Sequence, residues 1–119
     1  MAWSFSADKP VYLQIADRIR KKVVSGEFLP GDQIPTVRQL ALTAAVNPNT
    51  VQHAFVELER EGLIVSHGTV GRYVTEDAEV IEGCRSMMAE HIIGDFVREI
   101  GQLAISPDEA IHMIEEAMK

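Results

Sequence analysis

Hydrophobic side chains recur at helical spacing in three successive segments of the first half of the chain. The spacing predicts helices over residues 10–25, 37–45 and 48–61. The apolar positions of these helices form one stripe each, and together they define the expected core: Tyr12, Ile15, Ala16, Ile19, Val23, Val37, Leu40, Ala41, Ala44, Val51, Ala54, Phe55 and Leu58.

Polar residues mark where the second and third helices begin. Thr36 and Gln39 form a capping-box pattern, in which each side chain bonds to a backbone N–H of the other residue. Asn47 is a good N-terminal cap, and Pro48 after it is the favoured first helical residue. The two helices are therefore expected to be joined by a tight turn.

Two short β-like runs follow the third helix, at residues 63–66 and 72–75. Gly68 and Gly71 lie in the connection between them, which predicts a hairpin. Three helices followed by a hairpin, or wing, are typical of the winged helix-turn-helix. The expected fold is therefore mostly α with a small β-hairpin, and residues 1–77 form its DNA-binding domain.

The last third of the chain carries a long apolar stripe. It predicts one helix of about 24 residues, and a capping box at residues 106–109 starts a short final helix. A lone helical pair cannot bury so wide an apolar face, which predicts that residues 78–119 are a dimerisation segment; packing on the winged domain is the alternative. The residues expected to dimerise are Ile81, Met88, Ile92, Phe96, Ile100 and Leu103.

The composition favours a cytoplasmic protein and its charge is unevenly placed. The 119 residues have a net charge of −7, but residues 1–77 carry eight basic and nine acidic side chains, whereas residues 78–119 carry three and nine. The acidity therefore does not exclude DNA binding by the first part. The single cysteine fits a reducing compartment, and neither a signal peptide nor an apolar run of about 20 residues is evident.

The chain shows no pattern expected of an enzyme or a metal protein. It has no Gly-rich phosphate loop, nucleophile elbow, C-x-x-C or H-x-x-x-H. Cys84 and His91 lie two helical turns apart, which does not suit one zinc ion. We therefore expect neither catalysis nor a cofactor.

The outer face of the third helix carries side chains suited to reading DNA. Asn49, Thr50, Gln52 and His53 begin it, whereas a merely solvated face usually carries Glu and Lys. Amides and hydroxyls both donate and accept hydrogen bonds, as base edges require. Arg38, at the start of the second helix, is placed to reach a phosphate or a guanine edge; a surface salt bridge is the alternative.

Two further groups of residues have weaker signals. Arg72 is the expected DNA contact of the wing, while His67 and Thr69 fit either a contact or ordinary loop polarity. The basic cluster near the end of the first helix fits helix-dipole complementarity better than phosphate contact: Arg18, Arg20, Lys21 and Lys22.

Three blocks of sequence carry a family resemblance: P-V-Y-L-Q-I at residues 10–15, G-E-F-L-P-G-D-Q-I-P-T-V-R-Q-L-A at 26–41 and V-N-P-N-T-V-Q-H-A-F-V-E-L-E-R-E-G-L-I at 46–64. Together they resemble the GntR family of bacterial transcription regulators, and the short helical tail is similar to the YtrA-like subfamily. The resemblance implies a homodimer that binds a palindromic operator and usually represses transcription.

The resemblance also implies which residues contact DNA. It assigns this role to Arg38, to a wing glycine that is best matched by Gly68, and to the start of the third helix, where the matching residues are Asn47, Asn49, Thr50 and Gln52. Two departures stand out: the wing H-G-T-V-G-R-Y-V differs from the common G-K-G-T-F-V, and His53 stands where arginine is frequent.

The sequence thus predicts a sequence-specific, double-stranded-DNA-binding regulator that acts as a homodimer. A winged-helix module that binds protein and not DNA is the alternative. A small-molecule effector is compatible with the first function, but the sequence does not identify one, and the short tail leaves little room for its pocket.

Overall fold

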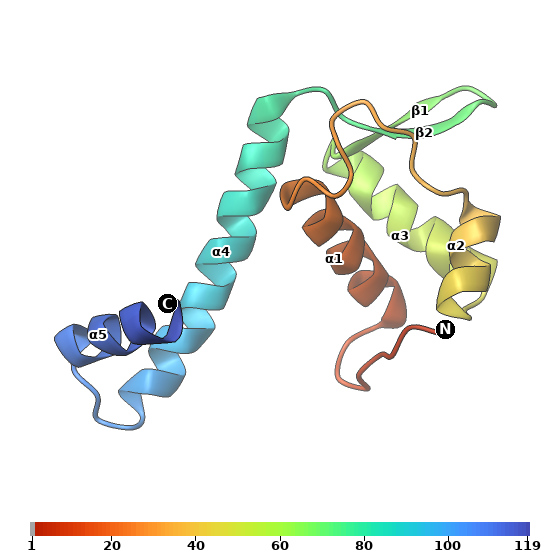
Figure 1. Cartoon of the computed structure of the whole chain (residues 1–119). Coiled ribbons are helices and arrows are strands. Elements are labelled where there is room, and N and C mark those ends of the chain that lie inside the picture. Colours follow the sequence, from red (N-terminus) through yellow and green to blue (C-terminus); the bar gives the residue numbers. More distant parts are fainter. Residues whose placement is uncertain (1) are drawn as a thin grey trace. The chain divides into compact units, whose positions relative to one another are not determined.

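The structure is a computed structural model that describes residues 2–119 and divides into two compact units, Met1–Arg85 and Ser86–Lys119. The described residues form five helices and one two-stranded hairpin, joined by turns and loops (Figure 1). Within residues 2–119, no helix combines the length and the apolar character needed to cross a membrane. The mostly α fold with a small hairpin confirms the predicted fold class.

Helices α1 (Val11–Val24), α2 (Val37–Ala44) and α3 (Pro48–Arg60) enclose the core of the first unit. The predicted inner positions of all three helices are buried, except for Tyr12 and Val37, which are half-buried against the core. Full burial of an aliphatic or aromatic side chain stabilises the folded state by about 1.5–3 kcal/mol relative to leaving it exposed. The apolar stripes therefore explain why these helices pack together.

Both predicted helix starts are present. The Thr36 hydroxyl accepts from the Gln39 backbone N–H at 3.1 Å, and the Gln39 side chain accepts from the Thr36 N–H at 2.9 Å. The predicted end of α2 was one residue too long. Ala45 lies in the left-handed region (φ 59°) instead of continuing the helix. The N–H of the next residue, Val46, donates to the Ala41 carbonyl at 3.1 Å.

Ala45 gives a test of this turn. A non-glycine residue in the left-handed conformation costs about 1 kcal/mol, which glycine avoids. We expect Ala45→Gly to raise the free energy of unfolding by about 0.5–1 kcal/mol, measured by urea denaturation. Ala44→Gly, one residue earlier in the buried part of the helix, is the matched control and should lower it by about 1 kcal/mol. Equal losses in both variants would contradict the turn geometry.

The wing consists of β1 (Ile64–His67) and β2 (Gly71–Val74), which pair antiparallel with Ile64 opposite Val74. The predicted strands lay within one residue of these bounds. The structure adds a partner on the other edge of β2: the Ile34 N–H donates to the Arg72 carbonyl at 2.9 Å, and the Val74 N–H donates to the Asp32 carbonyl at 2.8 Å. The segment before α2 therefore fixes the wing.

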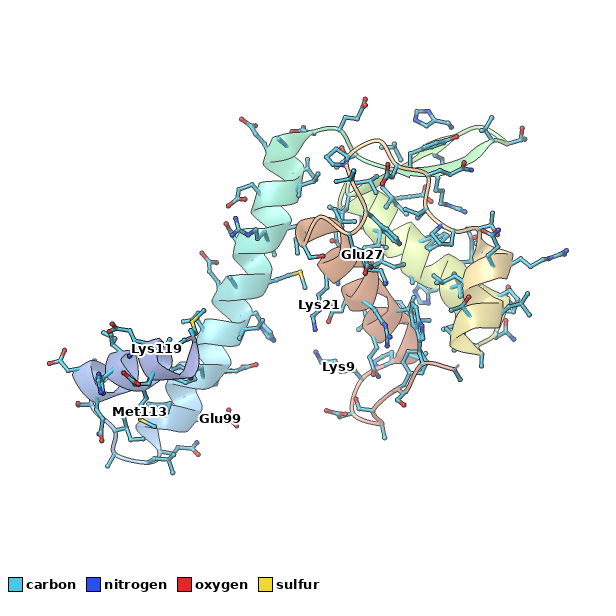
Figure 2. The ribbon with its side chains drawn as sticks, in the orientation of Figure 1. Lys9, Lys21, Glu27, Glu99, Met113 and Lys119 are labelled. Atoms are coloured by element: carbon cyan, nitrogen blue, oxygen red, sulfur yellow. The ribbon has the colours of Figure 1, made fainter. Side chains whose placement is uncertain are left out.

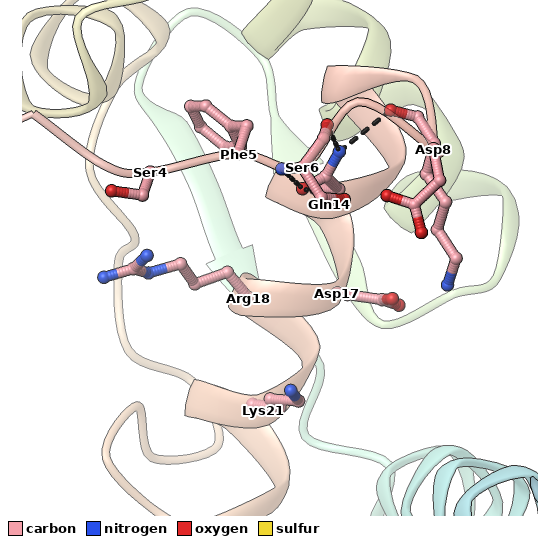
Figure 3. A pocket seen from close by; sticks show the side chains of 9 residues that line it. Ser4, Phe5, Ser6, Asp8, Gln14, Asp17, Arg18 and Lys21 are labelled. Carbon is pink, nitrogen blue, oxygen red and sulfur yellow. Dashed lines mark hydrogen bonds between the residues drawn. The ribbon is translucent and has the colours of Figure 1, made fainter.

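The residues before α1 form an arm that closes one side of the core. Trp3 and Phe5 pack against it, and the Trp3 N–H donates to the Ala44 carbonyl at 3.4 Å. The Gln14 amide holds the arm by accepting from the Ser6 N–H at 2.9 Å and donating to the Ser6 carbonyl at 2.9 Å (Figure 3). Between arm and α1 lies an open hollow.

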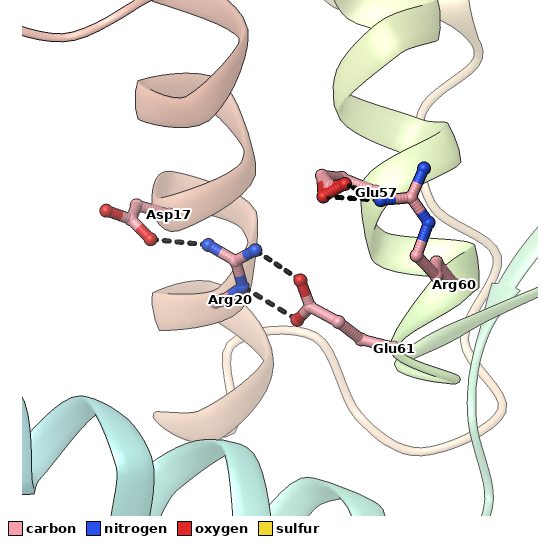
Figure 4. A network of polar contacts seen from close by, with 5 residues as sticks. All are labelled: Asp17, Arg20, Glu57, Arg60 and Glu61. Atoms are coloured by element: carbon pink, nitrogen blue, oxygen red, sulfur yellow. Dashed lines mark hydrogen bonds and ion pairs between the residues drawn. The ribbon is translucent and has the colours of Figure 1, made fainter.

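Ion pairs, more than the helix dipole, explain much of the basic cluster in α1. Arg20 binds Glu61 at the end of α3 through two nitrogens, and it also contacts Asp17 at 2.5 Å (Figure 4). The hydrogen bonds to Glu61 raise the pKa of Arg20. Lys22 pairs with Glu27 at 2.6 Å. The Arg20–Glu61 pair thus joins α1 to the end of α3, while the Lys22–Glu27 pair joins the end of α1 to the turn that follows it.

Helix α4 (Ala78–Gly101) begins in the first unit and continues into the second. Its first turns contribute Val80, Ile81 and Cys84, which are half-buried against the winged-helix core. Burial raises the pKa of the Cys84 thiol. The start of α4 therefore packs on the winged-helix core of its own chain. For these first turns the alternative interpretation of the apolar stripe, packing on the winged domain, is correct.

The second unit holds the end of α4 and helix α5 (Pro107–Ala117). Ser106 caps α5 as predicted, since its hydroxyl accepts from the Glu109 N–H at 3.2 Å. Ala110 is the only buried residue of Ser86–Lys119, and apolar side chains such as Met113 on α5 remain exposed (Figure 2). This unit has almost no core of its own.

Candidate nucleic-acid interface

The outer face of α3 is polar and open along two turns. Asn49, Gln52, His53 and Val56 follow one another at helical spacing and all are exposed, whereas Thr50 is half-buried. The faces differ because Val51, Ala54, Phe55 and Leu58 take the inner positions. The helix therefore presents two amides and an imidazole on a rigid, well-packed support.

Asn47 has a structural role at the start of this face. Its side-chain oxygen accepts from the Asn49 N–H at 2.8 Å and so caps α3. The N–H groups of the first helical turn have no partner within the helix and carry a partial positive charge. The start of α3 is therefore suited to an anion such as a phosphate.

Arg38 is the second residue of α2, the helix before α3 in the chain, and it is exposed. No ion pair within residues 2–119 involves it, unlike Arg20, Arg60 and Arg72. The alternative of a surface salt bridge is thus not what the structure shows. Its guanidinium has all five donors available for a phosphate or a guanine edge.

Arg72 lies on β2 opposite Ser66, one residue pair away from the pair that flanks the turn, and its side chain packs against α3. Its Nε donates to Glu59 Oε1 at 2.6 Å, and its guanidinium carbon is 5.0 Å from the centre of the Phe55 ring. A terminal nitrogen donates to Gln52 Oε1 at 3.5 Å. The side chain is 24% exposed, so it joins the wing to α3 more than it reaches into solvent.

The wing tip leaves its backbone accessible. Gly68 is exposed with φ +57°, and a Cβ there would meet nothing within 4 Å. At the strand end, Gly71 has φ +145°, and its Cβ would come within 2.6 Å of Gln33 Nε2, which donates to the Val70 carbonyl at 3.2 Å. Gly68 is thus placed for close backbone approach, while Gly71 serves the packing of Gln33 under the turn.

Two contacts around the face were not predicted from the sequence. His53 stacks on Tyr12 of α1 with ring centres 3.5 Å apart and an interplanar angle of 6°. His67 packs edge-on against Tyr73 at 4.9 Å, which gives this wing histidine a packing role. Tyr12 was assigned to the core, and its helical spacing gave no sign that one face of its ring would hold a residue of α3.

Residues 11–74 match the model of the bacterial regulatory proteins of the gntR family. The chain belongs to the GntR family. An uncharacterized HTH-type transcriptional regulator YhcF of Bacillus subtilis is 36% identical over 110 residues, which are 92% of this chain and 91% of YhcF. The HTH-type transcriptional repressor YtrA of the same species is 40% identical over 85 residues, or 70% of this chain and 65% of YtrA. The predicted family is therefore confirmed.

Solved structures of GntR regulators share the fold. A GntR family transcriptional regulator from Listeria monocytogenes superposes with a TM-score of 0.88 at 34% identity and covers 94% of this chain and 98% of its own. The AraR DNA-binding domain, solved in complex with operator ORX1, has a TM-score of 0.57 at 25% identity over 63% of this chain and 95% of its own. The protein is a GntR-type DNA-binding transcription regulator.

Proposed function

We propose that this GntR-type regulator is a repressor that binds a palindromic operator as a homodimer, with α3 in the major groove. The observation that carries the proposal is the open amide face on α3, together with an exposed Arg38 on α2 that takes part in no ion pair among residues 2–119. Side chains of these types read base edges and hold phosphates. The name of the relative YtrA, a transcriptional repressor, supports the sign of regulation.

The expected contacts divide into three groups by position. Asn49, Gln52 and His53 face the groove, and Thr50 lies at its margin. Asn47 and the first N–H groups of α3 lie where a phosphate is held. In the third group, Arg38 on α2 contacts a phosphate or a guanine edge, and Gly68 allows the wing backbone to approach DNA. Arg72 connects this wing with α3.

The second unit supports the homodimer. A helical pair whose only buried residue is Ala110 has little to stabilise it alone, and Ile92 and Leu103 expose 60% and 68% of their surface. Large apolar patches of this kind mark interaction surfaces. A second copy would cover Ile92 and Leu103 together with Met88, Phe96 and Ile100, while Ile81 is already half-buried against its own winged-helix core. Residues 78–119 are thus proposed as the dimerisation segment and residues 1–77 as the DNA-binding domain.

Selection of duplexes from a random pool tests the proposal. We expect a motif with two inverted half-sites whose centres lie about one helical turn apart, roughly 34–36 Å or a multiple. Binding should weaken steeply with salt, because phosphate contacts release counterions. Salt-insensitive binding to a protein, with no duplex retained, would instead support the protein-interaction alternative. If the protein is a repressor, expression of a reporter gene placed behind the recovered motif should rise when the protein is absent.

A further inference from the structure

Gln52 and Arg72 come from different elements but meet on the outer side of α3. Arg72 is held in place from two sides, by the Glu59 carboxylate at 2.6 Å and by the Phe55 ring under its guanidinium. Gln52 is exposed, and its only hydrogen bond among the described residues is the one that its Oε1 accepts from Arg72. In this contact the amide oxygen lies 3.5 Å from the Arg72 nitrogen, so the oxygen end of the amide faces the wing.

We propose that Arg72 is a positioning residue that turns Gln52 into a hydrogen-bond donor toward DNA, so that the chain prefers guanine over adenine at the base pair that Gln52 faces. The inference rests on the proposed function, because it requires α3 to lie in the major groove. It assigns Arg72 a role in specificity, beyond the wing contact expected of it.

The preference follows from the two ends of an amide. An unrestrained glutamine pairs with adenine through both ends, since Oε1 accepts from N6 while Nε2 donates to N7. When Oε1 faces Arg72, the NH₂ group points away from the wing and leads into the groove. Guanine offers two acceptors there, N7 and O6, whereas adenine offers one acceptor beside a donor. A donor-only Gln52 therefore matches guanine.

Glu59 is needed to hold this arrangement. A carboxylate on the groove-facing side of a DNA-binding helix would repel phosphates if it stood alone. Arg72 neutralises Glu59, and in return the ion pair keeps the guanidinium within reach of Gln52. The same pair thus removes an unfavourable charge and orients a base-reading amide.

The experiment compares motifs that the whole chain and its variants recover from a random pool of double-stranded DNA. Gln52→Ala identifies the base pair that Gln52 faces, because the preference there is lost. Arg72→Lys keeps the positive charge beside Glu59, but its single nitrogen lacks the planar fork that spans Glu59 and Gln52. We expect the guanine-to-adenine binding ratio at that base pair to fall on the order of tenfold in Arg72→Lys.

Two controls separate positioning from a general structural role. Arg60 lies on α3, the helix of Gln52, but it pairs with Glu57 and does not contact Gln52. Arg60→Lys should therefore leave the recovered motif unchanged. Arg72→Lys should add no change of base preference in the Gln52→Ala background. Arg72→Leu, which retains the packing on Phe55 but no donor, should shift the preference as Arg72→Lys does.

The outcomes are distinguishable. A motif in which Arg72→Lys keeps the wild-type preference, or in which the wild type prefers adenine at the Gln52 base pair, overturns the inference and leaves the proposed function intact. If the wild-type chain recovers no motif at all, the proposed function fails and the inference fails with it. A uniform loss of affinity across all bases would give Arg72 a phosphate contact only and would also overturn the inference.

Discussion

Arg38→Ala is expected to weaken operator binding by about 1–3 kcal/mol, which is roughly tenfold to a hundredfold in Kd. Arg38 is exposed on α2 and has no ion pair within residues 2–119, so the substitution removes a guanidinium that the fold itself does not use. If Arg38 contacts a phosphate, the slope of log Kd against log salt should fall by about one. Fluorescence anisotropy at several salt concentrations measures both quantities.

Arg85→Ala is the matched control for this prediction. It removes the same charge from an exposed arginine of the same unit that pairs with Glu82 at 3.3 Å on α4. Both variants should keep the wild-type free energy of unfolding within about 0.5 kcal/mol, as exposed substitutions usually do. Equal losses of DNA affinity in the two variants would show that Arg38 acts only through net charge, and the predicted contact would be wrong.

The helical part of the fold was predictable because its signals are local. The inner residues of α3 recur at 3.6-residue spacing, and Thr36 and Asn47 mark helix starts by bonding to backbone groups within three residues. Each of these signals needs only a few neighbouring residues. The same holds for the hairpin, whose glycines lie between two β-like runs.

Contacts between distant segments were not predictable from these patterns. The pairing of residues 32–34 with β2 was missed because prolines and glycine around the segment indicate a loop. The pair Arg20–Glu61 spans 41 positions, and nothing in the local sequence distinguishes Arg20 from its basic neighbours. Ala45 shows a third kind of limit, since a left-handed alanine contradicts the usual preference for glycine there.

The candidate site was predicted as a set of residues but not as a set of orientations. Helical spacing placed Asn49, Gln52 and His53 on the outer face. It did not reveal that Tyr12 would stack on His53, or that Arg72 would lie between Gln52 and Glu59. These contacts orient side chains of the candidate site, so the arrangement of its hydrogen-bonding groups depends on tertiary structure even where its composition does not.

If the proposed dimer forms through residues 78–119, the double substitution Ile92→Glu and Leu103→Glu is expected to yield a monomer and to lower affinity for the complete operator by about two to four orders of magnitude. Both residues are largely exposed in the single chain, so the winged-helix unit should unfold with its wild-type free energy. In the proposed dimer a second copy buries these side chains, and two buried carboxylates without partners cost several kcal/mol. Once the dimer dissociates, the second half-site is no longer bound intramolecularly.

Sedimentation and binding to two duplexes separate this effect from misfolding. Affinity for a duplex with one half-site should be unchanged in the double variant, because each winged-helix unit still reads its own half-site. Gln102→Glu introduces one negative charge, half of what the double variant adds, at an exposed polar position next to Leu103, and it should leave both the proposed dimer and operator affinity intact. A double variant that remains dimeric would place the dimer interface elsewhere, and a double variant that also loses the single half-site would tie these residues to the DNA-binding unit itself.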